Sequence, residues 1–448
     1  MKQEPFFFLR DGKIYDAQDK IKIFRGLVVH VPKIPFEQRL GQNIQPQDAK
    51  SFFLNLKHKG INLVVWQLPW EAVEPDEPEK YDEEYLAQLR SILKQAEEQE
   101  IFVVVQPVIA NWCRMTDGEG APLWTLEAAG IDLKKLKEAG GAAQHFVQLN
   151  KLKKGNPIFE YIQSTMFTLF WAGKDFAPNM IVDGDNIQDY LQNHFIAAMK
   201  HVARRIKDCK TVIGFSCLAE AQQGFVGMQG PAKFDLIKAA SAIPITYKRN
   251  SGKLLFAKQS SELIFSSPTT IFKDSNVCLW QQAQMWHADK NQNAFLDRPD
   301  YFLPTNGKDF AEDYMKPFQQ NFIEAFQKKH GHYLFLSEPC TNGQRVTWKL
   351  ADKASDDYNF AVEKEGGVLP NFDFEASKII ATYIVPNMPK TLTGRVDVKN
   401  LEKKLEEQMF RAKKGGFPAL GIFCMQANQL ICELLNRNNE SYVLNALN

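Results

Sequence analysis

The sequence INLVVWQL at Ile61–Leu68 is the stretch that decides the fold. It is apolar for almost its whole length and lacks strict alternation of polar and apolar residues, which is typical of a parallel strand buried on both faces. Similar runs recur along the chain, and together they give eight strand candidates: Ile21–Val31, Ile61–Leu68, Ile101–Val108, Val212–Leu218, Tyr333–Leu336, Lys378–Val385, Ala419–Met425 and Ser441–Leu447.

The stretches between these runs predict amphipathic helices. Glu83–Glu98 is the clearest, because Tyr85, Leu86 and Leu89 fall on one side and Lys and Glu residues on the other. The same pattern predicts helices at Gln47–His58, Asn186–Ile206, Ala311–Lys329, Val398–Lys413 and Ala427–Asn436. Eight strands with interleaved helices predict an α/β fold, the closed (β/α)8 TIM barrel.

A hairpin and two long insertions surround the predicted barrel. Residues 1–20 predict a small N-terminal β-hairpin, with its turn at Asp11-Gly12, that caps the bottom of the barrel. Residues 111–185 and 222–330 are far longer than ordinary connections. Both follow strands on the C-terminal face, where barrel active sites are built. We therefore expect one domain, 1–448, rather than the three that length alone would allow.

Composition and charge narrow the classes of partner and cofactor. The chain has 54 Lys and Arg against 53 Asp and Glu, a net charge of +1, so nucleic acid is not expected as a partner. Aromatic residues reach 12%, which indicates large buried clusters or an aromatic-lined cleft. The seven cysteines are scattered and form no C-x-x-C pair. This pattern predicts neither a disulfide framework nor a metal site, and we expect no cofactor.

The sequence also bears on location. Met1–Phe8 has one Lys and a short apolar stretch, too little for the apolar region of a signal peptide. No apolar run approaches the length of a transmembrane segment. We expect a cytoplasmic protein, or one delivered without a cleaved signal peptide.

Several segments of this chain resemble glycoside hydrolase family 5, in its branch of endoglycoceramidases and fungal-type glucosylceramidases and steryl-glucosidases. The resembling segments are Leu9–Pro35, Gly60–Leu86, Gly118–Asp132, Thr165–Ile196 and Val212–Gly227. The resemblance implies a TIM barrel and a retaining mechanism. In that mechanism one glutamate protonates the leaving oxygen and another attacks the anomeric carbon, with carboxyl groups about 5–5.5 Å apart.

The resemblance assigns the two catalytic positions as follows. The family's Asn-Glu-Pro motif aligns with Ala219-Glu220-Ala221, so Glu220 keeps the acid/base position while Ala219 replaces the Asn. The family's Gly-Glu-Phe-Gly motif aligns with Gly421-Ile422-Phe423-Cys424, so Ile422 stands where the nucleophile belongs. A branched alkyl side chain cannot attack a sugar.

Other family residues are replaced as well. Val65 takes the place of an Arg on the second strand, and Gln106 and Val108 take those of an Asp and a His on the third. Val385 replaces a Tyr on the sixth, whereas Lys33 on the first follows the family pattern. These replacements predict a pseudo-glycosidase that binds a glycolipid, another carbohydrate or amphiphile, or a protein partner through its long loops.

Two alternatives remain open at this point. One is an active glycosidase with rearranged chemistry, which pairs Glu220 with Glu338 or with an acid from a loop. The other concerns the candidate ligand-binding residues, since core packing explains the tryptophans equally well. These candidates are Lys33, Trp112, Trp124, Trp171 and Tyr383.

Overall fold

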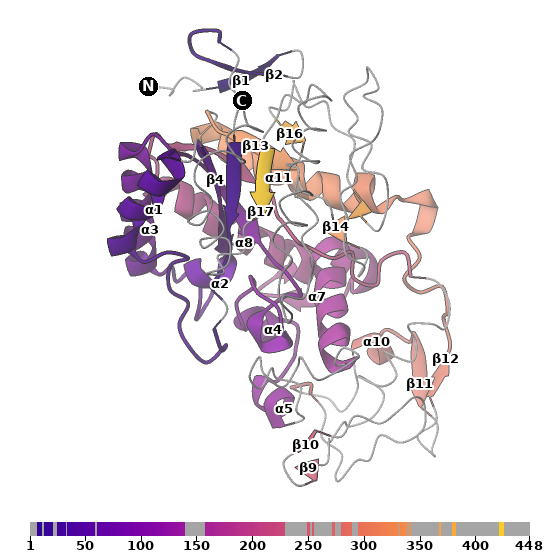
Figure 1. Ribbon diagram of the computed structural model, residues 1–448. Coiled ribbons are helices and arrows are strands. Elements are labelled where there is room, and N and C mark those ends of the chain that lie inside the picture. Colours follow the sequence, from indigo (N-terminus) through magenta and orange to yellow (C-terminus); the bar gives the residue numbers. More distant parts are fainter. Residues whose placement is uncertain are drawn as a thin grey trace, which may run out of the picture.

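The centre of the molecule is a parallel sheet (Figure 1). The computed structural model describes residues 7–10, 13–20, 25–32, 34–58, 61–138, 157–228, 249–250, 253–254, 271–273, 279–288, 294–330, 332–337, 340–341, 367–368, 379–381 and 421–424. The described strands of the sheet follow the order β16-β13-β8-β5-β4-β3-β17. They are β3 (Arg25–Val29), β4 (Leu63–Pro69), β5 (Phe102–Val108), β8 (Val212–Ser216), β13 (Leu334–Ser337), β16 (Ile379–Ala381) and β17 (Gly421–Cys424).

Six of these strands lie in chain order from β3 to β16, each parallel to the next. All seven residues of β4 are buried, which explains why this strand shows no polar–apolar alternation. Parallel neighbours in chain order, with helices in the connections, are the arrangement of a (β/α) barrel. The prediction of an α/β barrel is confirmed.

The position of β17 differs from the expectation. The sequence order placed this run seventh, with Ser441–Leu447 between it and the first strand. In the structure β17 pairs directly with β3, Gly421 opposite Arg25 and Cys424 opposite Val28. β17 therefore takes the place expected for the eighth strand, while Ser441–Leu447 lies outside the described residues. Both runs are short and apolar, so their patterns do not distinguish which one pairs with β3.

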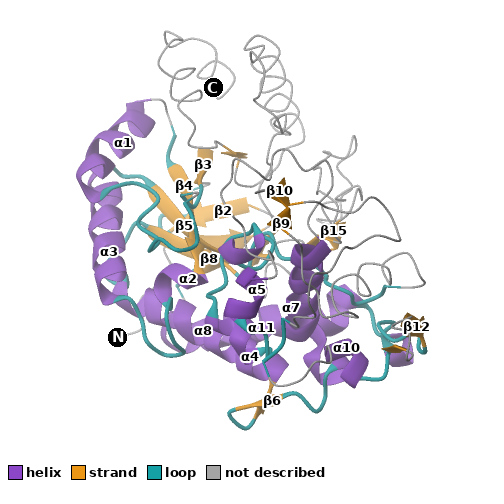
Figure 2. Cartoon of the chain, turned by 90° about the horizontal axis from the view of Figure 1, so that it is seen from below, coloured by secondary structure: helices purple, strands orange, loops and turns teal. Residues whose placement is uncertain are grey.

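Helices cover the outer side of the sheet, and Figure 2 shows α1, α3, α8 and α11 around the strands. The helices are α1 (Pro46–His58), α2 (Trp70–Val73), α3 (Glu83–Glu98), α4 (Trp124–Ala128), α5 (Leu133–Glu138), α7 (Pro157–Phe176), α8 (Ile187–Arg205), α10 (Leu279–Gln282) and α11 (Lys316–His330). A π-helical turn, η4 (Ala311–Met315), precedes α11, and 3₁₀ turns form η1 (Arg114–Thr116) and η3 (Thr305–Gly307). The predicted helices at Val398–Lys413 and Ala427–Asn436 lie outside the described residues.

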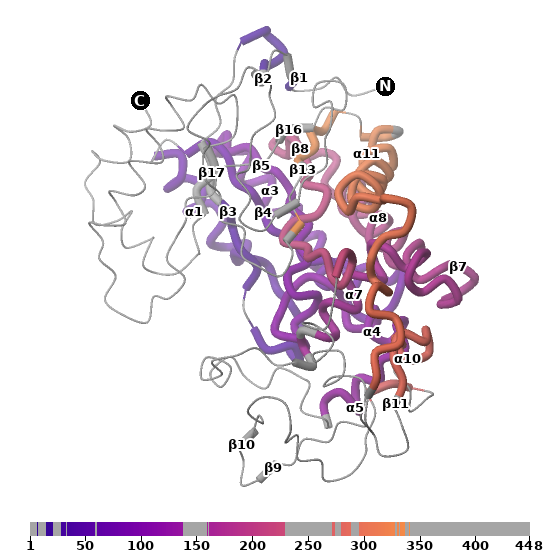
Figure 3. Tube along the Cα trace, turned by 90° about the vertical axis from the view of Figure 1, so that its right-hand side faces the viewer, coloured from indigo at the N-terminus to yellow at the C-terminus, as the bar shows by residue number. Residues whose placement is uncertain are grey.

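Side-chain caps fix where two of the covering helices begin. Asp82 accepts a hydrogen bond from the Tyr85 backbone N–H at the start of α3, and Asn186 accepts one from Gln188 at the start of α8. The residues of α3 and α8 that are buried include Leu89 and Leu93 on α3 and Leu191 and Phe195 on α8. Figure 3 shows α8 and α11 side by side on this outer surface.

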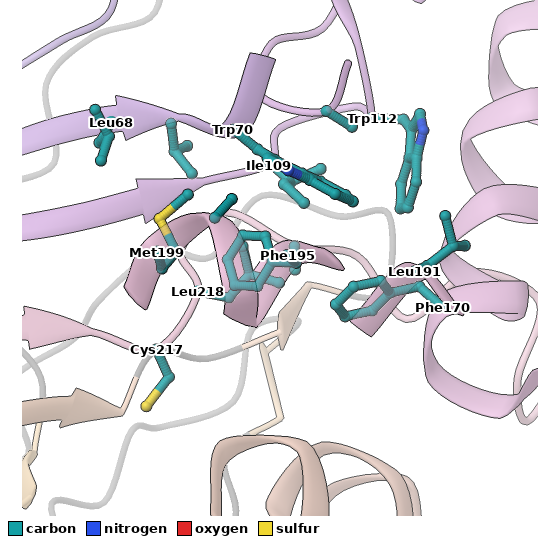
Figure 4. Packing of buried hydrophobic residues seen from close by; sticks show 14 of the residues in the cluster. Leu68, Trp70, Ile109, Trp112, Phe170, Leu191, Phe195, Met199, Cys217 and Leu218 are labelled. Atoms are coloured by element: carbon teal, nitrogen blue, oxygen red, sulfur yellow. The ribbon is translucent and has the colours of Figure 1, made fainter. Parts of the chain in front are cut away.

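The core between helices and strand ends is rich in aromatic rings. The rings of Trp70 and Phe195 pack edge to face with centroids 5.6 Å apart, and Trp112 and Phe170 do so at 6.1 Å. Figure 4 shows this packing of side chains from the strand ends against those of α7 and α8. The high aromatic content of the chain is thus explained largely by the core.

The N-terminal hairpin is present as predicted. β1 (Phe7–Arg10) and β2 (Lys13–Asp16) pair antiparallel, with Arg10 opposite Lys13. Phe7 packs edge to face on Phe102, the first residue of β5, at 5.3 Å. Because Phe102 begins its strand, this contact places the hairpin at the N-terminal end of the sheet.

The two insertions contain more regular structure than long loops would. Residues 111–185 include the 20-residue helix α7, and its kink at Ala172 has φ −139°. Short antiparallel strand pairs complete the described structure: β6 (Ile181–Val182) with β7 (Asp185–Asn186), β9 (Arg249–Asn250) with β10 (Lys253–Leu254), β11 (Trp286–Ala288) with β12 (Ala294–Leu296), and β14 (Cys340–Thr341) with β15 (Gly367–Val368). None of the helices that the structure describes is both long enough and apolar enough to cross a membrane.

Candidate functional site

Glu220 lies just beyond the C-terminal end of β8. Its neighbour Ala219 continues the sheet, because its N–H donates to Pro107 O at 2.8 Å and its carbonyl accepts from Ile109 N at 3.1 Å. Glu220 then adopts a left-handed backbone conformation with φ 60°, which is uncommon for a residue with a side chain. The turn leaves Glu220 exposed at the edge of the sheet where barrel enzymes carry their active sites.

The Glu220 carboxylate is held by a residue of β4, which is separated from β8 by β5 in the sheet. Gln67 Nε2 donates to Glu220 Oε1 at 2.9 Å, and Gln67 Oε1 lies 3.0 Å from His30 Nδ1 and 3.4 Å from Val31 N. The Val31 N–H can only donate, so the amide oxygen of Gln67 must face it. The amide nitrogen therefore faces Glu220, and His30 carries a proton on Nδ1.

The residues that the resemblance aligns with charged or polar family side chains are buried and uncharged. Val65, Gln106 and Val108 have no exposed surface, and Ala219 is 1% exposed. Val65 pairs with Val28 and with Val104 on the adjacent strands. Val65 and Gln67 share one face of β4 because they are two residues apart. Along this face of β4, the apolar side chain of Val65 thus precedes the amide of Gln67, which is nearer to the C-terminal end of the strand.

Only some of the other predicted site residues lie within the described part of the structure. Ile422 is on β17, where its backbone pairs with Gly26. The second candidate carboxylate, Glu338, lies outside the described residues, as do Lys33, Tyr383 and Val385. The separation between Glu220 and Glu338, on which the rearranged-chemistry alternative depends, remains a prediction.

The three candidate ligand-binding tryptophans are buried, which favours the core-packing alternative over a stacking surface. Trp112, Trp124 and Trp171 are 0%, 6% and 1% exposed. Each indole N–H has a partner within the protein: Thr125 Oγ1 at 3.0 Å, Glu74 O at 3.0 Å and Gln222 O at 2.8 Å, respectively. A buried indole with a satisfied donor is explained by packing, so these rings are not available to a ligand.

The sequence analysis missed four polar residues at this edge: His30, Gln67, Asn111 and Gln222. The last two join the loops after β5 and β8, since Gln222 Nε2 donates to Asn111 Oδ1 at 2.5 Å. Asn111 and the following Trp112 both have positive φ, 51° and 69°. The available signal was Gln67 itself, a polar residue inside an otherwise apolar run. Such a residue is buried only where it finds a hydrogen-bond partner.

Two buried carboxylates lie beyond these strand ends. Glu71 forms an ion pair with Arg114, and burial raises the pKa of Glu71 while Arg114 opposes that rise. Burial raises the pKa of Glu74 to about 7, although its carboxylate accepts a hydrogen bond from Trp70 Nε1 at 2.6 Å. Across the described ranges no group of three or more His, Cys, Asp or Glu residues is arranged to hold a metal ion.

Comparison with known proteins agrees with this architecture. No protein-family model matches the chain. It is 30% identical over 324 residues to a glucosylceramidase of Rhizopus delemar, covering 66% of this chain and 47% of the relative. It is 22% identical over 353 residues to an ergosteryl-β-glucosidase of Saccharomyces cerevisiae, covering 65% of this chain and 46% of the relative. The chain thus spans about half the length of the curated relatives that it matches.

A solved structure supports the fold. The crystal structure of Cryptococcus neoformans sterylglucosidase 1 superposes with a TM-score of 0.63 at 20% identity, covering 94% of this chain and 68% of that one. At this identity the likeness concerns the fold alone. The chain is therefore a TIM-barrel relative of the glucosylceramidases and ergosteryl-β-glucosidases, in the glycosidase branch that its sequence resembles.

Proposed function

We propose that this chain is a catalytically silent relative of lipid β-glucosidases, which binds the sugar head group of a glycolipid or sterol glucoside at the strand ends around Glu220. The observation that carries the proposal is a partner of Glu220 among the described residues: its side chain accepts a hydrogen bond from the neutral amide of Gln67. The resemblance, which aligns Ile422 with the family's nucleophile, supports the same conclusion.

The chemistry of retaining glycosidases explains why this set of residues favours binding over hydrolysis. The reaction needs one carboxyl group to protonate the leaving oxygen and a second to form the glycosyl intermediate. Ile422 supplies no nucleophile, and Val65 and Val108 supply no charge to orient one. A lone general acid gives only part of the usual rate gain.

The polar groups that remain suit an uncharged sugar. Glu220 offers carboxylate oxygens, and Gln67, Asn111 and Gln222 offer amide donors and acceptors at the same edge of the sheet. Sugar hydroxyls can donate hydrogen bonds to the carboxylate, and they can both donate to and accept from the amides. The names of the relatives, glucosylceramidase and ergosteryl-β-glucosidase, indicate a β-glucoside with a lipid aglycone as the ligand class.

Docking of a protein partner through the insertions has less support. In the described part of residues 222–330, the large hydrophobic side chain that is exposed is Phe295, at 48%. A single exposed ring of this kind is ordinary for a protein surface. We therefore rank ligand binding ahead of a protein interface.

The proposal is tested by measuring binding and hydrolysis on the same preparation. Binding is measured by calorimetry with octyl β-glucoside and by co-sedimentation with phosphatidylcholine vesicles that contain glucosylceramide. Hydrolysis is followed as glucose released from glucosylceramide and from 4-methylumbelliferyl β-glucoside. We expect binding that weakens in Glu220→Gln, without glucose release.

Two results would overturn the proposal. Turnover that disappears in Glu220→Gln would establish an active enzyme with rearranged carboxylates, the alternative reading of Glu220. Failure of the wild-type chain to bind either octyl β-glucoside or the glucosylceramide vesicles would exclude the binding role. Vesicles of phosphatidylcholine alone serve as the control for adsorption to the bilayer.

A further inference from the structure

His30, Gln67 and Glu220 form a chain of hydrogen bonds that runs from the end of β3 through β4 to the segment after β8. Gln67 is 1% exposed, and its two polar atoms face different partners: Nε2 faces Glu220, whereas Oε1 faces His30 and the backbone of Val31. Since Val31 N–H is a fixed donor, the direction of every bond in this chain is determined. If the Gln67 amide were rotated by 180°, its NH2 group would face the N–H donors of His30 and Val31, and its oxygen would face the Glu220 carboxylate.

We propose that Gln67 is a positioning residue that holds the Glu220 carboxylate as an acceptor for sugar hydroxyls, and that this arrangement selects uncharged over anionic head groups. The inference rests on the proposed function and names its specificity determinant. Glu220 is exposed and follows a left-handed turn, so without a partner its side chain would sample several rotamers. A bond from a buried amide removes that freedom before the ligand arrives, which lowers the entropic cost of binding.

The selectivity follows from the charge of the groups involved. A carboxylate accepts hydrogen bonds from hydroxyl groups, and a bond with one charged partner is stronger than a neutral one. The same carboxylate repels a carboxylate or sulfate on the ligand at short range. Because its partner Gln67 is a neutral amide, this hydrogen bond does not itself neutralise the negative charge of Glu220.

The Gln67 variants test the positioning role. We expect Gln67→Leu to weaken octyl β-glucoside binding about tenfold, the loss of roughly one hydrogen bond to a charged group. His30→Phe should weaken it less, about threefold, because the Val31 N–H still orients the Gln67 amide. Gln88→Leu is the matched control, since Gln88 also donates to a glutamate, Glu84 at 3.4 Å, but is half-buried on the covering helix α3.

A double-mutant cycle separates positioning from general support of the structure. The losses caused by Gln67→Leu and Glu220→Gln should not multiply in the double variant, because each change removes the same arrangement. Independent, multiplying losses would contradict the positioning role. If Gln67→Leu fails to fold, as judged by its unfolding transition, the cycle is carried out with His30→Phe instead.

The selectivity is tested with octyl β-glucuronide, which differs from the glucoside by a carboxylate. We expect the wild-type chain to prefer the glucoside by at least tenfold, and Glu220→Gln to lose most of this preference. Equal binding of both ligands to the wild-type chain, with glucoside binding intact, would overturn the inference but leave the proposed function standing. Absence of glucoside binding would instead overturn the proposed function and this inference together.

Discussion

The guanidinium of Arg114 spans the carboxylate of Glu71, with Nε 3.0 Å from Oε1 and 2.9 Å from Oε2. Both side chains are more than nine-tenths buried. Arg114 also donates to the carbonyls of Pro35 at 2.6 Å and Gln38 at 2.9 Å. This one side chain therefore joins the insertion after β5, the helix after β4 and the segment after β3.

The Arg114 pair predicts a large loss of stability when one partner is removed. Arg114→Met leaves Glu71 buried without its cation, and we expect the free energy of unfolding to fall by about 3–5 kcal/mol. The combined Arg114→Met and Glu71→Leu variant should recover part of this loss, because no buried charge remains. Urea denaturation of the wild type, both single variants and the double variant measures these values. If the double variant lost as much free energy of unfolding as the two single variants together, this account would be wrong.

The backbone at Gly120 lies so close to that of Val108 that we expect a side chain at Gly120 to destabilise the fold. Gly120 has φ +121°, and a Cβ there would lie 2.1 Å from the Val108 carbonyl oxygen. We expect Gly120→Ala to reduce stability by about 3 kcal/mol or more, since both the backbone conformation and the space exclude a side chain. Gly130→Ala is the control, because Gly130 also has positive φ, +77°, but has open space around it. Its thermal midpoint should fall much less than that of Gly120→Ala.

The fold was largely predictable because its determinants are local. The helix expected at Glu83–Glu98 has those bounds in the structure, since periodicity and the Asp82 cap both act within a few residues. Helix α7 was missed because its sequence is apolar on most sides and shows no clear stripe. Its helical conformation is stabilised by burial against α8 and η1, which the sequence alone does not specify.

The candidate site was harder to predict because its contacts are not local. Gln67 and Glu220 are 153 positions apart, and their contact depends on the register of β4, β5 and β8. The family resemblance located Glu220 but gave no role to Gln67. The tryptophans were ambiguous for a similar reason, since exposure decides between stacking on a ligand and packing in a core.

Because Trp124 is buried, we expect its substitution to change the stability of the protein but not its affinity for a ligand. Trp124 packs edge to face on Trp70 at 5.2 Å and donates to Glu74 O. We expect Trp124→Phe to lower the free energy of unfolding by about 1–3 kcal/mol through the lost hydrogen bond and packing. Under conditions in which the variant is fully folded, its affinity for octyl β-glucoside should be unchanged. A weaker affinity with unaltered stability would return Trp124 to the ligand-binding residues.

The last prediction concerns pH and the buried Glu74. Its carboxylate has no exposed surface, accepts from Trp70 Nε1 and from the Glu79 N–H, and has His194 Nδ1 at 3.9 Å from Oε1. Burial raises the pKa of Glu74 from 4.5 to about 7 in the folded protein. The same cause, burial, lowers the pKa of His194. His194 therefore does not supply a full positive charge to Glu74 near neutral pH.

A folded-state pKa above the unfolded value means that the folded protein binds the proton more tightly. The contribution of Glu74 to stability is therefore fully present below about pH 4.5 and decreases as pH rises to about 7. The shift corresponds to roughly 3 kcal/mol across this interval. Glu74→Gln cannot ionise, so its stability should decline less between pH 5 and pH 8 than that of the wild type. Urea denaturation at several pH values measures the slope, with the exposed Glu84→Gln as control, and parallel curves for wild type and Glu74→Gln would show that Glu74 does not titrate in this range.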